Sequence, residues 1–275
     1  MSTGTDTGAD TGADTGTDTG TQAGRLHALP EPRTEEDENR EGMGEHRSYD
    51  LPPQQKIPYV YEALARQYGP LEWRPHTDPL SELVLTMLSQ NTSDTNRDRA
   101  FRALKARYPT WEQVRDAPTH ELAQTIKPAG LSNIKAPRIQ QVLRQITEER
   151  GSLDLSFLMD MPVDEAKAWL STFKGVGPKT AACVLMFACG KPVLPVDTHV
   201  YRVSRRLGLI SARTGVERAH QALESMVEPD RRYSFHIYLI RHGRLVCRAQ
   251  RPLCDICVVR QWCQYYHNVN VAQGI

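Results

Sequence analysis

Long apolar segments and sheet-forming patterns are missing from this chain of 275 residues. No run of about 18 apolar residues occurs, so the usual signature of a membrane-spanning helix is absent. The chain opens with MSTGTD, without a positively charged and apolar leader. Alternation of apolar and polar residues is nearly absent, so β-strands are not expected. We therefore expect an all-α protein located in the cytoplasm, with no membrane partner.

Residues 1–50 contain almost no large apolar side chains. Twelve Asp and Glu against four Arg give this segment a net charge of −8. Its TGAD and TGTD repeats are rich in glycine and cannot bury enough surface to offset the entropy of ordering. We predict a disordered, acidic, low-complexity tail over 1–50. The remaining 30 basic and 21 acidic residues leave a basic body of charge +9.

Cysteine is scarce, with six residues in the chain, but four of them lie within seventeen residues. Their spacing is C-x6-C-x2-C-x5-C, in which one short interval suits two thiolates on a single turn and the longer ones can wrap a compact inorganic cluster. These four are Cys247, Cys254, Cys257 and Cys263. A [4Fe–4S] cluster is the first interpretation, with a zinc site or two disulfides as alternatives. Cys183 and Cys189 lie in an apolar stretch and are interpreted as buried thiols.

From about Ile57 onward, apolar residues recur at helical spacing, as in 83–88 and 142–146, between short polar turns. This body of about 215 residues is long enough for a large core. The pattern is compatible with one domain or with two all-α lobes.

The segment 173–182, FKGVGPKTAA, predicts a helix–hairpin–helix. Gly175 and Gly177 allow a tight turn with an approachable backbone, and Pro178 suits the first position of the following helix. The N–H groups of such a helix start favour an anion, and nucleic-acid phosphate is the candidate for a basic body. Lys179 lies in the first turn, where the helix dipole disfavours an ammonium and favours a nucleophilic amine. A solvated or phosphate-binding lysine is the alternative.

Asp197 follows Lys179 by eighteen residues, in the sequence PVDTHV. The helix from Pro178 to Cys189 advances about 18 Å, and the next eight residues can extend about 26 Å, so the chain is long enough to return Asp197 to the hairpin. Lysine and carboxylate can then share one cleft. Capping of the next helix is the alternative role of Asp197.

These residues resemble the endonuclease III family of helix-hairpin-helix base-excision DNA glycosylases. The resemblance extends from about Pro58 to Cys263 and rests on four motifs in the order and separation of the family. These are GVGPKTA at 175–181, VDTH at 196–199, HGR at 242–244 and the four cysteines. It implies a six-helix barrel containing the hairpin over 72–191, an iron–sulfur lobe over 52–71 plus 192–266, and a tail over 267–275.

The resemblance also implies a function. A damaged base, by family default an oxidised pyrimidine in double-stranded DNA, would be flipped into the cleft. Lys179 would attack C1′ and form a Schiff base, Asp197 would serve as the catalytic carboxylate, and β-elimination would nick the strand at the abasic site. The cofactor would be a [4Fe–4S] cluster on the four cysteines. We expect a monomer associated with the nucleoid.

Further DNA contacts are implied by the same resemblance. Gln90 and Asn91 occupy the segment that fills the gap left by a flipped nucleotide, and Leu131 occupies the position of an inserting leucine. Where the family has one glutamine, this chain has Gln90 one position early and Asn91 in register. The alternatives are polar caps for Gln90 and Asn91 and a core position for Leu131. The further implied DNA contacts are Gly175 and Gly177 of the hairpin and Arg248 and Arg251 of the cysteine loop.

Two other functions stay open at this level. A monofunctional mismatch glycosylase would not need Lys179, and a noncatalytic DNA-binding or redox module would not need the pair of Lys179 and Asp197. Three arginines follow Asp197 at helical spacing and fit either a DNA footprint or a solvated face. They are Arg202, Arg205 and Arg206.

Overall fold

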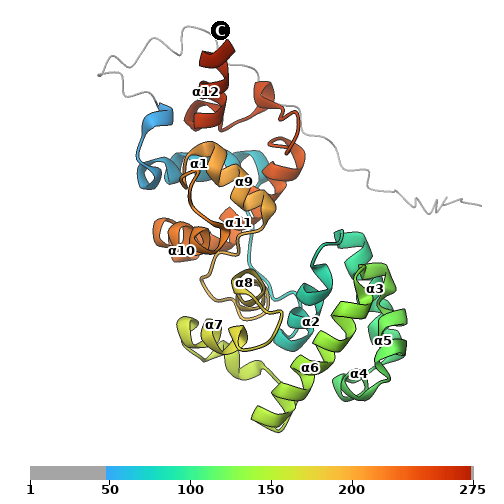
Figure 1. Cartoon of the computed structure of the whole chain (residues 1–275). Coiled ribbons are helices and arrows are strands. Elements are labelled where there is room, and N and C mark those ends of the chain that lie inside the picture. The colour runs from blue at the N-terminus through green and yellow to red at the C-terminus, as the bar shows by residue number, and fades with distance from the viewer. Residues whose placement is uncertain (1–47, 274–275) are drawn as a thin grey trace, which may run out of the picture. The chain divides into compact units, whose positions relative to one another are not determined.

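The computed structural model describes residues 48–273, and the regular secondary structure in that range is entirely helical, which confirms the all-α prediction. Figure 1 shows the arrangement of the helices. In chain order they are α1 (Pro53–Tyr68), α2 (Pro79–Ser89), α3 (Asp94–Arg107), α4 (Trp111–Asp116), α5 (Thr119–Thr125), α6 (Ser132–Arg150), α7 (Val163–Ser171), α8 (Pro178–Phe187), α9 (Thr198–Leu207), α10 (Val216–Met226), α11 (Arg232–Leu245) and α12 (Gln264–Gln273). Short 3-10 helices lie at Ser48–Asp50 (η1), Lys127–Ala129 (η2), Ser156–Met159 (η3), Pro229–Arg231 (η4), Cys254–Ile256 (η5) and Arg260–Trp262 (η6).

The starts of the helices that carry the site follow from local sequence. At α2, Pro79 occupies the first turn and the Asp78 side chain accepts a hydrogen bond from the backbone N–H of Ser81 at 2.9 Å. At α8, Pro178 follows the N-cap Gly177, because a proline with preset φ and no N–H suits a first position. The first turn of each of these helices therefore sets the direction in which the side chains that follow it point.

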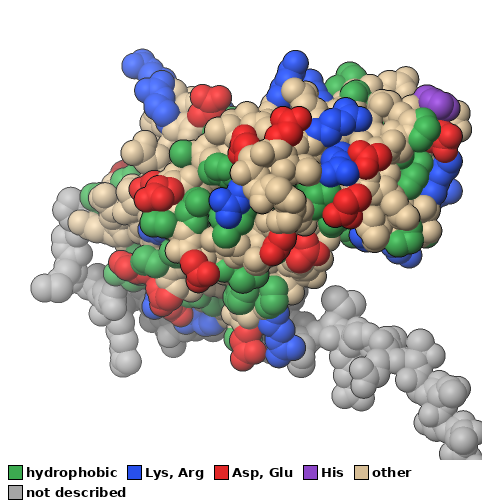
Figure 2. All heavy atoms as spheres, turned by 90° about the horizontal axis from the view of Figure 1, so that it is seen from below, with side chains coloured by type: hydrophobic (Ala, Val, Ile, Leu, Met, Phe, Trp, Pro, Cys, Tyr) green, Lys and Arg blue, Asp and Glu red, His purple; other side chains and the backbone are tan. Residues whose placement is uncertain are grey.

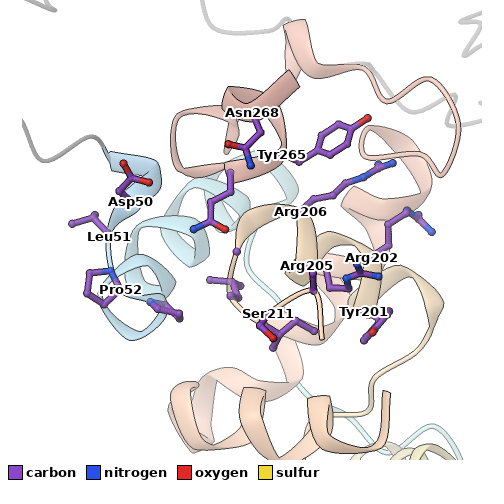
Figure 3. A pocket seen from close by; sticks show the side chains of 16 residues that line it. Asp50, Leu51, Pro52, Tyr201, Arg202, Arg205, Arg206, Ser211, Tyr265 and Asn268 are labelled. Atoms are coloured by element: carbon purple, nitrogen blue, oxygen red, sulfur yellow. The ribbon is translucent and has the colours of Figure 1, made fainter. Parts of the chain in front are cut away.

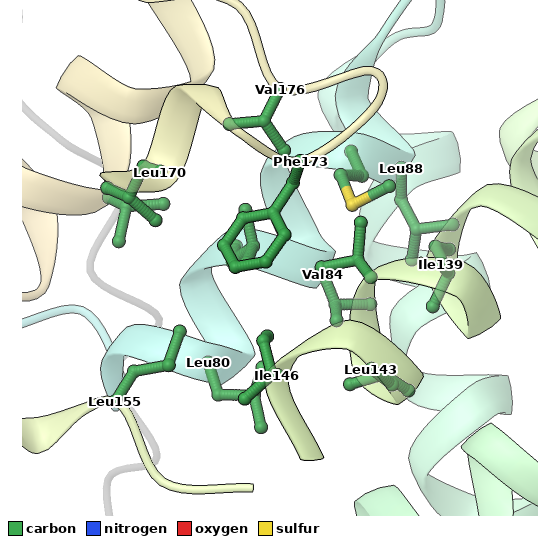
Figure 4. Close-up of a cluster of buried hydrophobic side chains, with 14 of the residues drawn as sticks. Leu80, Val84, Leu88, Ile139, Leu143, Ile146, Leu155, Leu170, Phe173 and Val176 are labelled. Atoms are coloured by element: carbon green, nitrogen blue, oxygen red, sulfur yellow. The ribbon is translucent and has the colours of Figure 1, made fainter. Parts of the chain in front are cut away.

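One hydrophobic cluster is built from residues between Leu80 and Val193. Side chains of α2, α6 and the segment joining α7 to α8 converge in it, with Phe173 among them (Figure 4). Phe173 is 1% exposed, so it anchors the hairpin that follows it to this core. Replacing such a buried phenylalanine by alanine typically costs about 3–5 kcal/mol.

A second hydrophobic cluster uses α1 and the chain from Leu194 to Cys263. It is made mainly of side chains from α1, α9, α10 and α11, with Val259 and Trp262 from the cysteine-rich segment. Membership changes from the first cluster to the second between Val193 and Leu194. The predicted lobe boundaries at 72–191 and 52–71 plus 192–266 stay a prediction.

The predicted tails differ from the structure at their inner ends. The acidic tail predicted for 1–50 lies outside the described residues as far as 47, while Ser48–Asp50 forms η1. The predicted C-terminal tail at 267–275 is helical as far as Gln273, because α12 continues through it. Among residues 48–273, no helix combines the length and the apolar character that crossing a membrane requires.

Candidate functional site

The hairpin between α7 and α8 exposes its backbone. Gly175 has φ +91°, a conformation that favours glycine, and a Cβ there would contact Arg138 Cδ of α6 at 3.4 Å. Gly177 is extended, with φ −94° and ψ −179°, and a Cβ there would meet nothing within 4 Å. The turn therefore requires Gly175, whereas Gly177 leaves open space in front of the uncapped start of α8.

Lys179 lies half-buried in the first turn of α8. One turn later lies the thiol of Cys183, which is 5% exposed and on which the Lys179 amine acts electrostatically. Burial raises the pKa of Cys183 to about 11, although the nearby Lys179 amine lowers it. Cys183 is therefore a neutral, buried thiol, in line with the prediction.

Asp197 is the N-cap of α9. Its Oδ1 accepts hydrogen bonds from the backbone N–H groups of His199 at 2.9 Å and Val200 at 2.7 Å. The capping role considered from the sequence is thus real. Capping also fixes the orientation of Asp197, so the two roles are compatible.

The charges of Lys179 and Asp197 both affect the pKa values of two buried side chains, His236 and Cys183. The imidazole of His236, 2% exposed, has its pKa lowered to about 4 by burial, raised in part by Asp197 and lowered further by Lys179. The charges of the same two residues act on the Cys183 thiol. The amine and the carboxylate therefore lie around one buried cluster, although no ion pair within 4 Å joins them among the residues described. Lys179 in the first turn of α8 and Asp197 at the N-cap of α9 therefore act electrostatically on the same two buried side chains.

Gln90 and Asn91 follow α2 and have different environments. Gln90 Nε2 donates a hydrogen bond to the carbonyl oxygen of Gly175 at 3.1 Å, which ties the end of α2 to the hairpin. Asn91 is exposed and has a left-handed backbone, with φ +54°. Gln90 is the C-cap residue of α2. The structure brings this segment to the hairpin.

Leu131 is not a core residue, so the alternative of a core leucine is wrong. Its side chain is 52% exposed and its φ is +49°, a strained conformation for leucine. Ile134, one turn further on α6, is 46% exposed. An apolar pair held exposed at the cost of strain is typical of a contact surface.

The four predicted ligating cysteines line one small pocket. All six cysteines are free thiols, so two disulfides are not what the structure shows. Within 48–273, however, no three or more His, Cys, Asp or Glu side chains are arranged so that they could bind a metal ion. The cluster ligands therefore stay a prediction.

The chemistry of the cysteine pocket fits an iron–sulfur cluster. Two nitrogen groups approach the sulfurs: Arg206 Nη1 is 3.3 Å from Cys247 Sγ, and His242 Nε2 is 3.4 Å from Cys257 Sγ. Soft sulfur donors with nearby N–H groups are the environment that such clusters use.

Two of the three arginines of α9 bind the cysteine loop, whereas Arg205 is exposed and lies over the ring of Tyr201. Arg202 donates to the carbonyl oxygens of Gly243 at 2.9 Å and Cys247 at 3.0 Å. Arg206 donates to the carbonyl oxygens of Arg248 and Ala249 at 2.6 and 3.0 Å. Both therefore hold the loop, a role that neither a DNA footprint nor a solvated face describes. The predicted DNA contacts Arg248 and Arg251 are exposed on this loop.

A cavity of about 740 Å³ opens between α9 and α12 (Figure 3). Arg202, Arg205 and Arg206 line one side of it, and Tyr265 and Asn268 of α12 line another. Its lining includes neither Lys179 nor Asp197. This cavity is therefore separate from the lysine site.

Three residues near the site were not predicted from the sequence. Glu82 of α2 is buried and acts electrostatically on Cys183, Arg138 lies beside Gly175, and Arg244 Nη2 is 2.8 Å from Asp94 Oδ2. Of these three residues, only Arg244 belongs to a motif recognised in the sequence, the HGR segment at 242–244. The face shown in Figure 2 carries acidic and basic side chains interspersed, without a continuous basic patch.

Comparison with known proteins shows the family to which this chain belongs. The sequence matches the HhH-GPD superfamily of base excision DNA repair proteins over residues 84–229. Endonuclease III of Thermotoga maritima is 35% identical over 209 residues, covering 75% of this chain and 93% of that protein. A relative from Arabidopsis thaliana, whose name describes it as a DNA glycosylase, is 36% identical over 172 residues. The match covers 62% of this chain and 59% of the relative.

A solved structure shows the same fold. A trapped covalent intermediate of endonuclease III with DNA superposes with a TM-score of 0.67 at 28% identity, covering 78% of this chain and 98% of the other. These matches define the class as the HhH-GPD superfamily. The chain belongs to the endonuclease III family of DNA glycosylases within that superfamily.

Proposed function

We propose that this protein is a bifunctional DNA glycosylase and abasic-site lyase of base excision repair that excises oxidised pyrimidines from double-stranded DNA. The observation that supports the proposal is that Lys179, in the first turn of α8, and Asp197, at the N-cap of α9, both act electrostatically on the buried side chains of His236 and Cys183. The covalent DNA intermediate of an endonuclease III with the same fold supports a nucleophilic enzyme group.

Lys179 is the nucleophile in this mechanism. Its amine bonds to C1′ of the flipped nucleotide while the glycosidic bond breaks, and the departing base takes the bonding electrons. The base gains one proton and the new amine loses one, so the step balances. Asp197, oriented by two N–H bonds on one oxygen, faces the developing positive charge of the sugar. Opening of the sugar ring then leaves a Schiff base, whose acidified C2′ proton is lost as the 3′ phosphate departs.

The DNA backbone is held around this centre. Gly175 and Gly177 present backbone to a phosphate at the start of α8, and Leu131 enters the gap left by the flipped nucleotide. Cys247, Cys254, Cys257 and Cys263 hold a [4Fe–4S] cluster. When bound, that cluster fixes the loop that carries Arg248 and Arg251 toward DNA phosphates.

Borohydride trapping tests the proposal. The protein is incubated with a duplex containing one thymine glycol and with a duplex containing one abasic site, and then reduced. We expect a covalent adduct on both duplexes, lost in Lys179→Ala and kept in Lys174→Ala, a matched change of an exposed lysine five residues earlier. Asp197→Asn keeps an acceptor for the helix cap and is expected to slow base excision roughly 10²-fold or more.

Each other outcome points to a different function. An adduct on the abasic duplex alone keeps the lyase and rejects thymine glycol as substrate. Excision without any adduct indicates a monofunctional glycosylase. No adduct and no excision, with DNA still bound, indicates the noncatalytic module.

A further inference from the structure

Glu82 is a buried carboxyl group that the mechanism above does not use. It lies in α2, and its side chain is 5% exposed. Oε1 accepts a hydrogen bond from Thr86 Oγ1 at 3.2 Å, whereas Oε2 has no hydrogen-bond partner among the described residues. The nearest nitrogen recorded for Oε2 is His76 Nδ1 at 3.9 Å, beyond hydrogen-bond range. A buried, unpaired carboxylate oxygen is costly, and protonation removes that cost.

Glu82 belongs to the same cluster as the nucleophile. Helix α2 packs against α8, and the charges of Glu82 and Lys179 act on one another and on Cys183. The other groups that act on or approach Glu82 are Arg97 of α3, Asp78 at the cap of α2, and His76. Lys135 of α6 also packs against α2, but its ammonium is bound to the carbonyl oxygens of Leu88 and Ala129.

The two carboxyl groups near Lys179 have opposite environments. Asp197 accepts two backbone N–H hydrogen bonds at a helix start, whereas Glu82 is buried in α2 with one unpaired oxygen. Burial raises the pKa of Glu82, and the hydrogen bond from Thr86 and the charges of Arg97 and Lys179 oppose that rise. A buried carboxyl group with a raised pKa is suited to act as a general acid.

We propose that Glu82 is the general acid of the excision step, which rests on the proposed glycosylase function. As Lys179 bonds to C1′, the electron pair of the glycosidic bond moves to the base, and the Oε2 proton of Glu82 is transferred to the base. The base therefore leaves neutral. Glu82 is left as a carboxylate and is reprotonated by solvent, while the new amine releases its own proton to solvent.

The proposal separates two reactions of the same site. Excision of a base needs a proton for the leaving group, whereas an abasic site has already lost its base. Glu82→Gln keeps the shape and removes the transferable proton. We expect base release in a single turnover to fall about 10²-fold or more, while borohydride trapping on abasic DNA falls less than about tenfold.

The pH profile provides the second readout. Excision by the wild-type protein should fall as pH rises through the pKa of Glu82, and Glu82→Gln should lose this alkaline limb. Thr86→Val removes the hydrogen bond that favours the charged carboxyl, so the alkaline limb should move to higher pH. A change in fold alone would not shift the limb in this direction.

The experiment uses duplexes with thymine glycol, 5-hydroxycytosine or uracil, and one with an abasic site. Glu82→Gln that excises at the wild-type rate, or that loses excision and abasic trapping equally, overturns the role of Glu82 and leaves the proposed function standing. A wild-type protein that traps on abasic DNA and releases none of the three bases overturns both the general acid and the glycosylase activity. A wild-type protein inactive on all four duplexes overturns the proposed function itself.

Discussion

The side-chain amide of Gln90 donates a 3.1 Å hydrogen bond to the carbonyl oxygen of Gly175, and so links the end of α2 to the hairpin before α8. The link leaves Asn91, with its left-handed backbone and exposed side chain, as the residue of this segment that projects to solvent. We infer that Gln90 positions the hairpin and that Asn91 meets the base opposite the lesion.

Substitution of these two residues should therefore have different effects. Gln90→Ala loses one hydrogen bond to the hairpin, worth about 1 kcal/mol, and should weaken binding to abasic-analogue duplexes about fivefold for every opposite base. Asn91→Ala should change the order of affinities among the four opposite bases. Titration of each variant with the four duplexes measures both effects. Base-dependent loss in Gln90→Ala and uniform loss in Asn91→Ala would reverse the assignment.

Substitution of Leu131 by glycine should stabilise the fold and weaken DNA binding. Leu131→Gly removes a strained left-handed leucine that is half exposed, so it should raise the free energy of unfolding by about 1 kcal/mol. The same change should weaken binding to a duplex with an abasic analogue about tenfold, because the gap is no longer filled. Chemical denaturation and binding titration test the two parts. Met159→Ala, at another exposed apolar position, should leave binding unchanged, and equal losses in both variants would contradict the wedge.

The cysteine pocket predicts cofactor content. Protein purified without oxygen should contain iron and acid-labile sulfide in the proportion of a [4Fe–4S] cluster, and Cys257→Ser should lose most of both. Cys189→Ser, outside the pocket, should keep them. Zinc in place of iron, with no sulfide, would favour the alternative metal site. Removal of the cluster should also lower stability, because ligand binding energy contributes to folding.

His236 should make the fold sensitive to acid. Its pKa is about 4 in the folded protein against 6.5 for an ordinary histidine, so the unfolded chain takes up the proton first as pH falls. The stability contribution is complete above about pH 6.5 and is lost progressively toward pH 4, by roughly 2 kcal/mol at pH 5. Urea unfolding at pH 7.5 and 5 should show a smaller pH-dependent loss in His236→Gln than in the wild-type protein. An identical loss in both would assign the acid sensitivity to other groups.

Local sequence was sufficient for several features. Proline at the first position of α8, the capping role of Asp197 and the left-handed turn at Gly175 depend on backbone geometry and neighbouring residues. Apolar residues at helical spacing predicted the all-α fold for the same reason. Composition alone did not predict the helix at residues 267–273. This polar segment was predicted to be a tail, but it is part of α12.

Other features depend on contacts between distant segments. Arg206 holds the carbonyl oxygens of a loop more than forty residues away, and nothing in its helical spacing indicated that role. Leu131 fits a core pattern by composition, yet the packing of α6 leaves it exposed.

The sequence by itself determined the helical class, the hairpin and the candidate nucleophile, because these are set by residue type and spacing along a few turns. Only the tertiary structure decided that Glu82 and Lys179 act on one another. Glu82 lies 97 residues before Lys179, and the packing of α2 on α8 brings its buried carboxyl group within electrostatic range of that amine. The environment that gives a carboxyl group its chemistry is made by side chains from separate helices, which no local pattern specifies.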